Sequence, residues 1–274
     1  MDVEGAPASL WDGHVGLLYR CERDYDASLA AWMRRGLHRG EKVVLTHVPG
    51  EAKDRVLRLC AEARVDAAQA GPAGQLVSLP AGQFYPPQGQ DELIAGAFAE
   101  GFSGVRLSAQ ASTALSIMSG GAYLAAEQAM DRHCRNGSVS VLCAYARPAP
   151  TDQPLRRTLA THSEGVRSLG LSSAPGERGV RLRGEVDLAT SDVLVAALDL
   201  AVGTMAGADE LALDLSELDF IDVAGSRTLL RATADFRQAG GRLVLERLQR
   251  PVARALRLMD VDKAPGVHCR EEQP

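Results

Sequence analysis

Two hydrophobic periods run along the chain and predict its elements. In the first half, apolar runs of strand length alternate with segments of helical period. Runs such as residues 14–19 and 41–48 (HVGLLY and EKVVLTHV) are largely apolar, which is typical of a parallel sheet that is buried on both faces. The predicted order is strand 14–19, helix 26–35, strand 41–48, helix 51–63, strand 75–79, helix 91–100, strand 104–107, helix 112–134 and strand 139–145. This alternation predicts a doubly wound α/β domain.

The second half mixes short strands with helices and predicts a smaller α/β domain. Its clearest stretch opens with Leu211, Leu213 and Leu215 in alternation with polar or small residues, the period of a half-buried strand. A tight segment is expected at 217–220, and Asp222 is expected to cap a helix that ends at Gly240-Gly241. Further strands are predicted at 167–172, 179–182 and 242–248, and further helices at 191–202 and 251–259.

Composition and charge narrow the class of protein. A chain of 274 residues accommodates two domains. Its net charge of −5 argues against a protein that binds nucleic acid through the phosphates. We find neither a signal sequence nor an apolar run near the ~20 residues of a membrane-spanning helix, so a cytoplasmic protein is expected. The five cysteines are scattered and form no Cys-x-x-Cys pair, so neither a disulfide framework nor a metal site is predicted.

The start of the helix after Asp222 is the first candidate for chemistry. Free backbone N–H groups and the helix dipole favour an anion at a helix N-terminus, so a phosphate could bind or be built there. The alternative is that Asp222 only caps the helix.

Residues 211–230 carry a family resemblance. The run LDLSELDFIDVAGSRTLL, together with the upstream Gly184-Glu185-Val186-Asp187 and Thr190, resembles the STAS domain, the fold of anti-sigma factor antagonists. The resemblance implies a small STAS α/β domain over residues 165–274. It also implies a partner-binding surface made of Asp187, Thr190, Asp222, Val223, Ala224, Gly225, Ser226 and Arg227.

The resemblance implies a switch, and this chain departs from it. In antagonists of this family an anti-sigma kinase phosphorylates a serine at this helix start, and the added charge opposes docking. Ala224 stands at that position and has no oxygen to modify. Either the domain binds without phosphorylation, under control of the first half, or Ser226 or Thr228 takes the phosphate. We favour the first alternative.

The first half resembles the MEDS domain, a sensory module. The resemblance rests on HVGLLY, RRGLHRGEKVVL, Gly74-Gln75-Leu76, GFSGVR at 101–106, VLCAY at 141–145 and Thr161-His162. It implies a RecA/KaiC-like fold without an intact P-loop over residues 10–163. The turn at 49–54 (PGEAKD) fits that loss, since it lacks the second glycine and the hydroxyl residue that should follow Lys53.

Three residues of the first half are candidates for contact with a small-molecule signal: His14, Tyr85 and Arg106. A charged residue within GVRL must find an anionic partner or solvent, and Glu127 is one candidate partner for Arg106. No arrangement of nucleophile, base and orienting group is recognisable, so no catalysis and no cofactor are expected.

Together these features predict a cytoplasmic signalling regulator. Its STAS domain is expected to bind an anti-sigma factor of the ATP-binding kinase type, under control of the MEDS-like sensor, with no nucleic acid or membrane as partner. Two alternatives stay open: a STAS protein that binds a nucleotide or another small molecule, and a subunit of a larger STAS assembly. A homo-oligomer is compatible with each.

Overall fold

The computed structural model describes residues 12–47, 52–66, 70, 73–147, 157–176, 178–204 and 209–270. The chain divides into two compact units, Met1–Arg147 and Pro148–Pro274. This division comes earlier in the chain than the domain boundary that the sequence predicts near residue 164, and that boundary stays a prediction.

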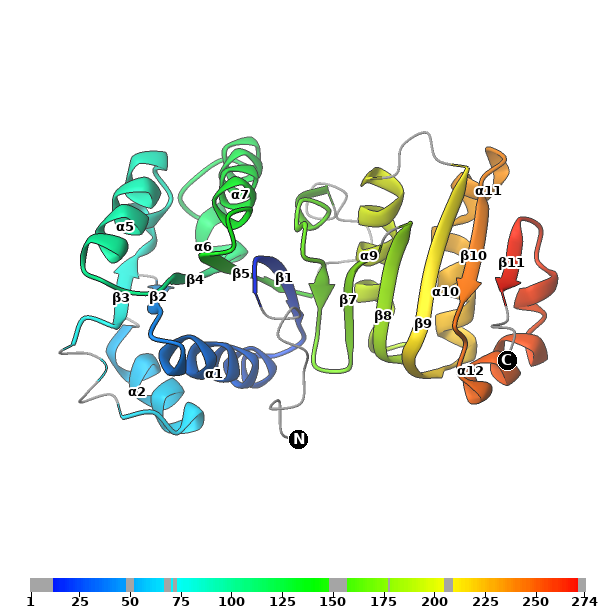
Figure 1. Ribbon diagram of the computed structural model, residues 1–274, viewed down its shortest axis with the longest axis horizontal. Helices are drawn as coiled ribbons and strands as arrows, with labels where there is room; N and C mark the ends of the chain where they lie inside the picture. The colour runs from blue at the N-terminus through cyan, green and yellow to red at the C-terminus, as the bar shows by residue number, and fades with distance from the viewer. Residues whose placement is uncertain are drawn as a thin grey trace. The chain divides into compact units, whose positions relative to one another are not determined.

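Five parallel strands form the sheet of the first unit, in the order β3-β2-β4-β5-β1 (Figure 1). All residues of β1 are buried, as are all but the last of β5. This burial confirms the interpretation of the apolar runs as strands that are covered on both faces. The strands are β1 (His14–Tyr19), β2 (Lys42–His47), β3 (Leu76–Pro80), β4 (Val105–Gln110) and β5 (Val139–Ala146).

Helices cover both faces of this sheet. In Figure 1, α1 (Glu22–His38) and α2 (Ala52–Ala63) lie on one side, whereas α5 (Pro87–Ala99) and α7 (Gly120–Cys134) lie on the other. Two short helices, α4 (Ala81–Phe84) and α6 (Ala111–Leu115), complete the described part of the unit. The doubly wound α/β prediction is confirmed, and the RecA/KaiC-like relationship stays a prediction.

Between β4 and β5 the structure has two helices where the sequence predicts one. The single helix predicted at 112–134 is wrong, because residues 116–119 separate α6 from α7. The side chain of Ser119 caps α7 by accepting a hydrogen bond from the backbone N–H of Ala122 at 3.3 Å, so a new helix starts there. Of the turn at 49–54 that was compared with a P-loop, residues 49–51 lie outside the described residues, and residues 52–54 begin α2.

Six strands form the sheet of the second unit, in the order β6-β7-β8-β9-β10-β11. The pairs β6–β7 and β7–β8 are antiparallel, and the remaining pairs are parallel. The strands are β6 (Val166–Arg167), β7 (Leu171–Gly176), β8 (Gly179–Val186), β9 (Glu210–Ile221), β10 (Arg242–Glu246) and β11 (Val267–Arg270).

Strand β9 is longer than predicted. The tight segment expected at 217–220 is wrong, since β9 continues through it and pairs with β8 as far as Ile221. Register shifts in β8 between Arg181 and Arg183, and between Gly184 and Glu185, let the pair continue where the simple alternation of the sequence breaks.

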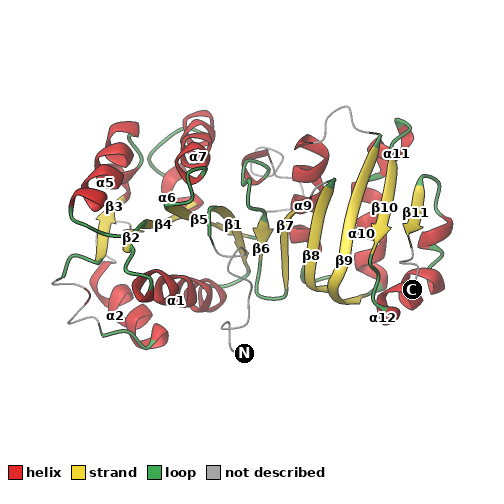
Figure 2. Cartoon of the chain, in the orientation of Figure 1, coloured by secondary structure: helices red, strands yellow, loops and turns green. Residues whose placement is uncertain are grey.

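The helices of the second unit are α9 (Ser191–Thr204), α10 (Val223–Ala232), α11 (Ala234–Gln238) and α12 (Arg250–Leu258). Figure 2 shows α9 and α10 on the same face of the sheet. The helix expected from Asp222 to residue 239 is split at Thr233, whose hydroxyl donates to the carbonyl of Leu229 at 2.8 Å. A side chain that bonds back into the preceding turn in this way often bends a helix.

The sheet of the second unit also carries a network of ion pairs. Asp214 accepts hydrogen bonds from Arg181 at 2.7 Å and from Arg247. Its second carboxylate oxygen accepts from the hydroxyl of Ser216 at 2.8 Å. Burial alone would raise the pKa of Asp214, but the bonds from Ser216 and Arg181 and the charge of Arg247 outweigh burial and hold this pKa below its ordinary value.

We predict a pH-dependent loss of stability for Asp214→Asn. A carboxyl whose pKa is lower in the folded state stabilises the fold above its unfolded pKa, about 3.9, and this contribution is lost as pH falls through the folded pKa. Urea unfolding should therefore show the variant roughly 1–3 kcal/mol less stable than wild type near neutral pH. The difference should shrink as pH falls below about 4. A difference that stays constant into acid would contradict this assignment.

Candidate partner-binding surface and a buried polar cluster

The start of α10 is held by hydrogen bonds to its own cap and to the neighbouring strand. The carboxylate of Asp222 accepts from the backbone N–H of Gly225 at 2.6 Å, which confirms the predicted N-cap. The backbone N–H of Asp222 donates to the carbonyl of Val186, the last residue of β8, at 3.0 Å. The first turn of α10 is therefore fixed at the ends of β8 and β9.

Gly225 is required by the close approach of α10 to β8. A Cβ atom at this position would lie 2.4 Å from Cγ1 of Val186 and 2.8 Å from the carbonyl oxygen of Val186. Neither distance is tolerated without a shift of the helix. Gly225 thus sets how deeply the start of α10 sits against the sheet.

Asp187 and Thr190 build the turn that leaves β8. The carboxylate of Asp187 accepts from the backbone N–H groups of Ala189 at 2.8 Å and Thr190 at 2.9 Å. The hydroxyl of Thr190 donates to the carbonyl of Glu185 at 2.9 Å. Because Asp222 bonds to Val186, this turn is adjacent to the start of α10. The two side chains stabilise the turn, and their direct contact with a partner stays a prediction.

Exposed side chains gather at this end of the second unit. Val223 and Arg227 are exposed on the first turns of α10, and Ala224 is partly exposed between them. Four exposed apolar residues come from segments that meet here, and we call them the apolar rim: Leu169, Leu188, Phe220 and Val223. The turn that carries Leu169 is fixed here because Gly170 accepts a hydrogen bond from the N–H of Glu185 at 2.9 Å. Clustered exposed apolar side chains mark interaction surfaces.

The hydroxyl residues at the start of α10, which are the two candidate phosphorylation sites, are buried. Ser226 and Thr228 are 2% and 6% exposed. Among the described residues, the hydroxyl of Ser226 has no hydrogen-bond partner. A kinase could reach either hydroxyl only after α10 had moved away from the sheet. Phosphorylation of Ser226 or Thr228 stays the less favoured alternative.

In the first unit, Arg106 lies fully buried within an ion-pair network. Its guanidinium bonds to the carboxylates of Glu41 and Asp12 and lies 5.1 Å from the ring centroid of Trp32. Its described carboxylate partners thus differ from Glu127, the candidate considered from the sequence. These contacts give Arg106 a structural role, and contact with a signal stays a prediction.

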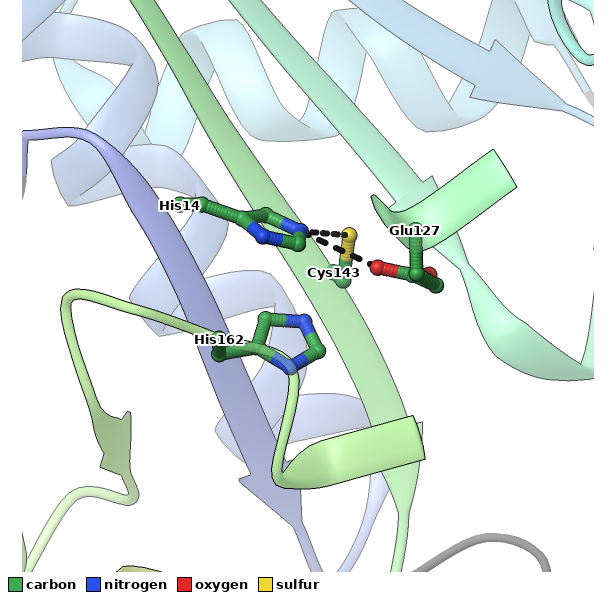
Figure 3. Close-up of side chains that lie close together, drawn as sticks. All are labelled: His14, Glu127, Cys143 and His162. Carbon is green, nitrogen blue, oxygen red and sulfur yellow. Dashed lines mark hydrogen bonds and ion pairs between the residues drawn. The ribbon is translucent and has the colours of Figure 1, made fainter. Parts of the chain in front are cut away.

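The other two sensor candidates lie on or near the α7 side of the sheet. Val15, Leu17 and Tyr19 pack into the core with α1, so the alternate position His14 faces the opposite side. There His14 Nε2 lies 3.0 Å from Oε2 of Glu127, on α7, and 3.5 Å from Sγ of Cys143, on β5 (Figure 3).

All three of these side chains are buried, and their potential ligand atoms lie within 4.8 Å of one another. We call His14, Glu127 and Cys143 the buried polar cluster. Figure 3 also draws His162, which belongs to the second unit and whose Nδ1 lies 3.0 Å from the carbonyl oxygen of Leu159.

Three buried tyrosines lie near enough to the buried polar cluster for the charge of Glu127 to affect their pKa values. Tyr85 is buried with its ring centroid 6.2 Å from that of Tyr123, and the hydroxyls of Tyr123 and Tyr145 are 3.0 Å apart. Burial raises the pKa of each of these three tyrosines well above its ordinary value, and the charge of Glu127 acts in the same direction.

The charge state of His14 follows from its carboxylate neighbours. Burial would lower its pKa, but the neighbouring carboxylates of Asp131 and Glu127 outweigh burial and raise the pKa to about 8. Burial and the charge of Glu127 also raise the pKa of the Cys143 thiol well above its ordinary value. In the absence of an ion, a protonated His14 beside Glu127 and a neutral Cys143 thiol therefore satisfy the charges of this cluster.

Sequence reasoning selects His14 but not its two neighbours in the cluster. The apolar strand around Cys143 favours a packing role for this residue, and the sequence suggests Glu127 only as a partner of Arg106. Glu127 and Cys143 stand 113 and 129 positions from His14 in the chain. A carboxylate on the face of a helix that otherwise packs on a sheet is the signal that the sequence offers.

Comparison with known families defines the class of protein. A family model described as "Mlab, STAS domain" matches residues 169–268, and the second unit is a STAS domain. A second family model, described as the methanogen/methylotroph, DcmR sensory domain (MEDS), matches residues 13–163. Since this match spans more than half of the 274 residues, the chain belongs to the MEDS family.

Comparison with individual proteins is less informative than comparison with the two family models. No curated protein sequence matches the chain. One similar solved structure is entitled "Structure of the Anti-Sigma Factor Antagonist SpoIIAA in its Unphosphorylated Form". It shares 18% sequence identity with a TM-score of 0.30, over 38% of this chain and 90% of that chain. None of the helices in the described ranges has both the length and the apolar character that crossing a bilayer requires.

Proposed function

We propose that this protein is an anti-sigma factor antagonist that acts in the cytoplasm and has no catalytic activity of its own. Its STAS domain binds an anti-sigma factor of the ATP-binding kinase type, and the MEDS unit controls that binding in response to a small molecule. The observation that carries the proposal is the start of α10, where a capped and rigid first turn presents exposed side chains beside the apolar rim.

The chemistry of this surface favours a protein partner. The apolar rim supplies apolar surface whose burial is favourable, and the exposed Arg227 offers a charge at the same place. Ala224 lies between Val223 and Gly225, where the related antagonists carry a phosphorylated serine, so no phosphate can form at that position. Docking is therefore controlled by the sensory unit rather than by a phosphate at residue 224.

Affinity capture of the full chain from its own cytoplasm tests this proposal, with proteins and phosphosites identified by mass spectrometry. We expect the wild-type protein to recover an anti-sigma factor of the kinase type and to carry no phosphate on Ser226 or Thr228. Recovery of no such factor, in a preparation that recovers the known partners of other proteins, would contradict the antagonist function.

Ala224→Asp places a charge in the proposed interface and should abolish recovery of the factor. An uncompensated charge in a closed interface costs about 3 kcal/mol or more, so affinity should fall by at least about a hundredfold. Ala239→Asp makes the same change at an exposed position after α11 and should leave recovery unchanged. Equal recovery by the two variants would place the interface elsewhere.

A further inference from the structure

Three kinds of ligand atom converge in the buried polar cluster. An imidazole nitrogen of His14, a carboxylate oxygen of Glu127 and the sulfur of Cys143 come from β1, α7 and β5. Each side chain is at most 2% exposed. A nitrogen, an oxygen and a sulfur donor are the three ligand types that proteins offer to zinc.

The distances between these atoms suit a single small ion. Bonds of 2.0–2.3 Å in a tetrahedral shell place neighbouring ligand atoms about 3.3–3.8 Å apart. The observed separations are 3.0 Å between His14 Nε2 and Glu127 Oε2, and 3.5 Å between His14 Nε2 and Cys143 Sγ. The ligand atoms of Glu127 and Cys143 lie within 4.8 Å of one another, so these two side chains approach each other to enclose an ion.

The other ring nitrogen of His14, Nδ1, faces a second carboxylate. This nitrogen lies 3.6 Å from Oδ1 of Asp131, one helical turn after Glu127 on α7. In metal sites, a carboxylate at the other ring nitrogen orients the imidazole and strengthens it as a ligand. Nδ1 of His14 therefore faces Asp131, while Nε2 faces Glu127 and Cys143.

We propose that His14, Glu127 and Cys143 bind a divalent transition-metal ion of the zinc class in the sensory unit, with Asp131 as the residue that orients His14. A thiolate and an imidazole select such an ion over magnesium or calcium, which take oxygen ligands. On binding, the ion replaces the thiol proton of Cys143 and the proton on Nε2 of His14, and these two protons leave to solvent, whereas Nδ1, which faces Asp131, keeps its proton. Three ligands of this unit leave a fourth coordination position.

This proposal is independent of the docking function of the STAS domain. It competes with one other explanation of the cluster, in which His14 and Glu127 form only an internal ion pair. The two explanations differ in the effect of an added metal ion. A bound ion raises thermal stability by mass action, whereas an ion pair that is already satisfied gains nothing from it.

Metal analysis of the full-length protein, purified without chelators, is the first test, followed by titration of the metal-free protein with Zn²⁺ and with Co²⁺. We expect close to one ion per chain, a rise in Tm with Zn²⁺, and a thiolate-to-cobalt charge-transfer band with Co²⁺. Cys143→Ala should lose the band and bind Zn²⁺ more than about a hundredfold more weakly. Cys60→Ser changes another buried thiol of the same unit and should retain both properties.

Glu127→Gln preserves shape and tests the site in case Cys143→Ala unfolds the protein. It should bind Zn²⁺ more weakly while its circular dichroism spectrum remains that of the wild type. A wild-type protein without bound metal and without a cobalt–thiolate band would overturn the proposal, and so would equal Zn²⁺ affinity in Cys143→Ala and Cys60→Ser.

Discussion

An Arg106→Ala variant is expected to lose about 3–5 kcal/mol of its free energy of unfolding. The guanidinium is fully buried and forms ion pairs with Glu41 and Asp12, and Glu41 itself is nearly buried. Truncation removes the fully buried cation of this network, although Asp12 keeps ion pairs with Arg35 and Arg39 and Glu41 keeps one with Arg39. It also removes the contact with the ring of Trp32. The penalty combines the lost charge-assisted hydrogen bonds with the lost packing of a large, fully buried side chain.

Urea unfolding of the full chain measures this loss. Arg58→Ala is the matched control, because Arg58 is exposed on α2 and should change stability by no more than about 0.5 kcal/mol. If Arg106→Ala is as stable as Arg58→Ala, the ion-pair network contributes little, and Arg106 becomes free to serve as a contact for the sensed molecule.

Gly184→Ala is expected to destabilise the second unit by roughly 2–4 kcal/mol. Gly184 has a φ of +104°, a conformation that residues with a side chain rarely adopt, and its Cβ would lie 2.3 Å from the carbonyl oxygen of Gly170. That oxygen holds the turn before β7 by accepting from Glu185. The substitution should therefore move the turn that carries Leu169 and weaken partner binding as well as stability.

Gly203→Ala tests whether any alanine in place of glycine would have this effect. Gly203 lies in α9, and a Cβ atom added there would meet no atom of the described residues outside its own helix turn within 4 Å. Alanine at this position should therefore be neutral or stabilise the helix by up to about 1 kcal/mol. Thermal unfolding of both variants provides the comparison. Equal Tm values would mean that β8 adjusts around Gly184 without strain.

The sequence predicted most elements because long apolar runs have few alternative explanations. Residues 14–19 and 139–145 form neighbouring parallel strands that are buried along almost their whole length, as expected from runs that are apolar on both faces. The errors arose where strand pairing, or a local side-chain bond to the backbone, overrides the hydrophobic pattern. Pairing with β8 extends β9 through residues 217–220, and the hydroxyl of Thr233 divides a helix whose periodicity continues.

The candidate sites were predictable to different degrees. Asp222 and Gly225 belong to one short motif, so their positions at the helix start followed directly from the sequence. The buried polar cluster did not, because β1, α7 and β5 come together only through the order of strands in the sheet. Buried Ser226 and Thr228 show a further limit, since helical position alone did not reveal which hydroxyls face the core.

The way Asp222 is held has a consequence for the thermodynamics of association. Its carboxylate is bonded to Gly225 and its backbone to Val186, so the chain at this surface is ordered before any partner arrives. A preformed surface loses little conformational entropy on binding, and that loss is a major cost of association for flexible loops. We therefore expect calorimetry to show a small entropic penalty on this side of the complex, with any larger adjustment made by the partner.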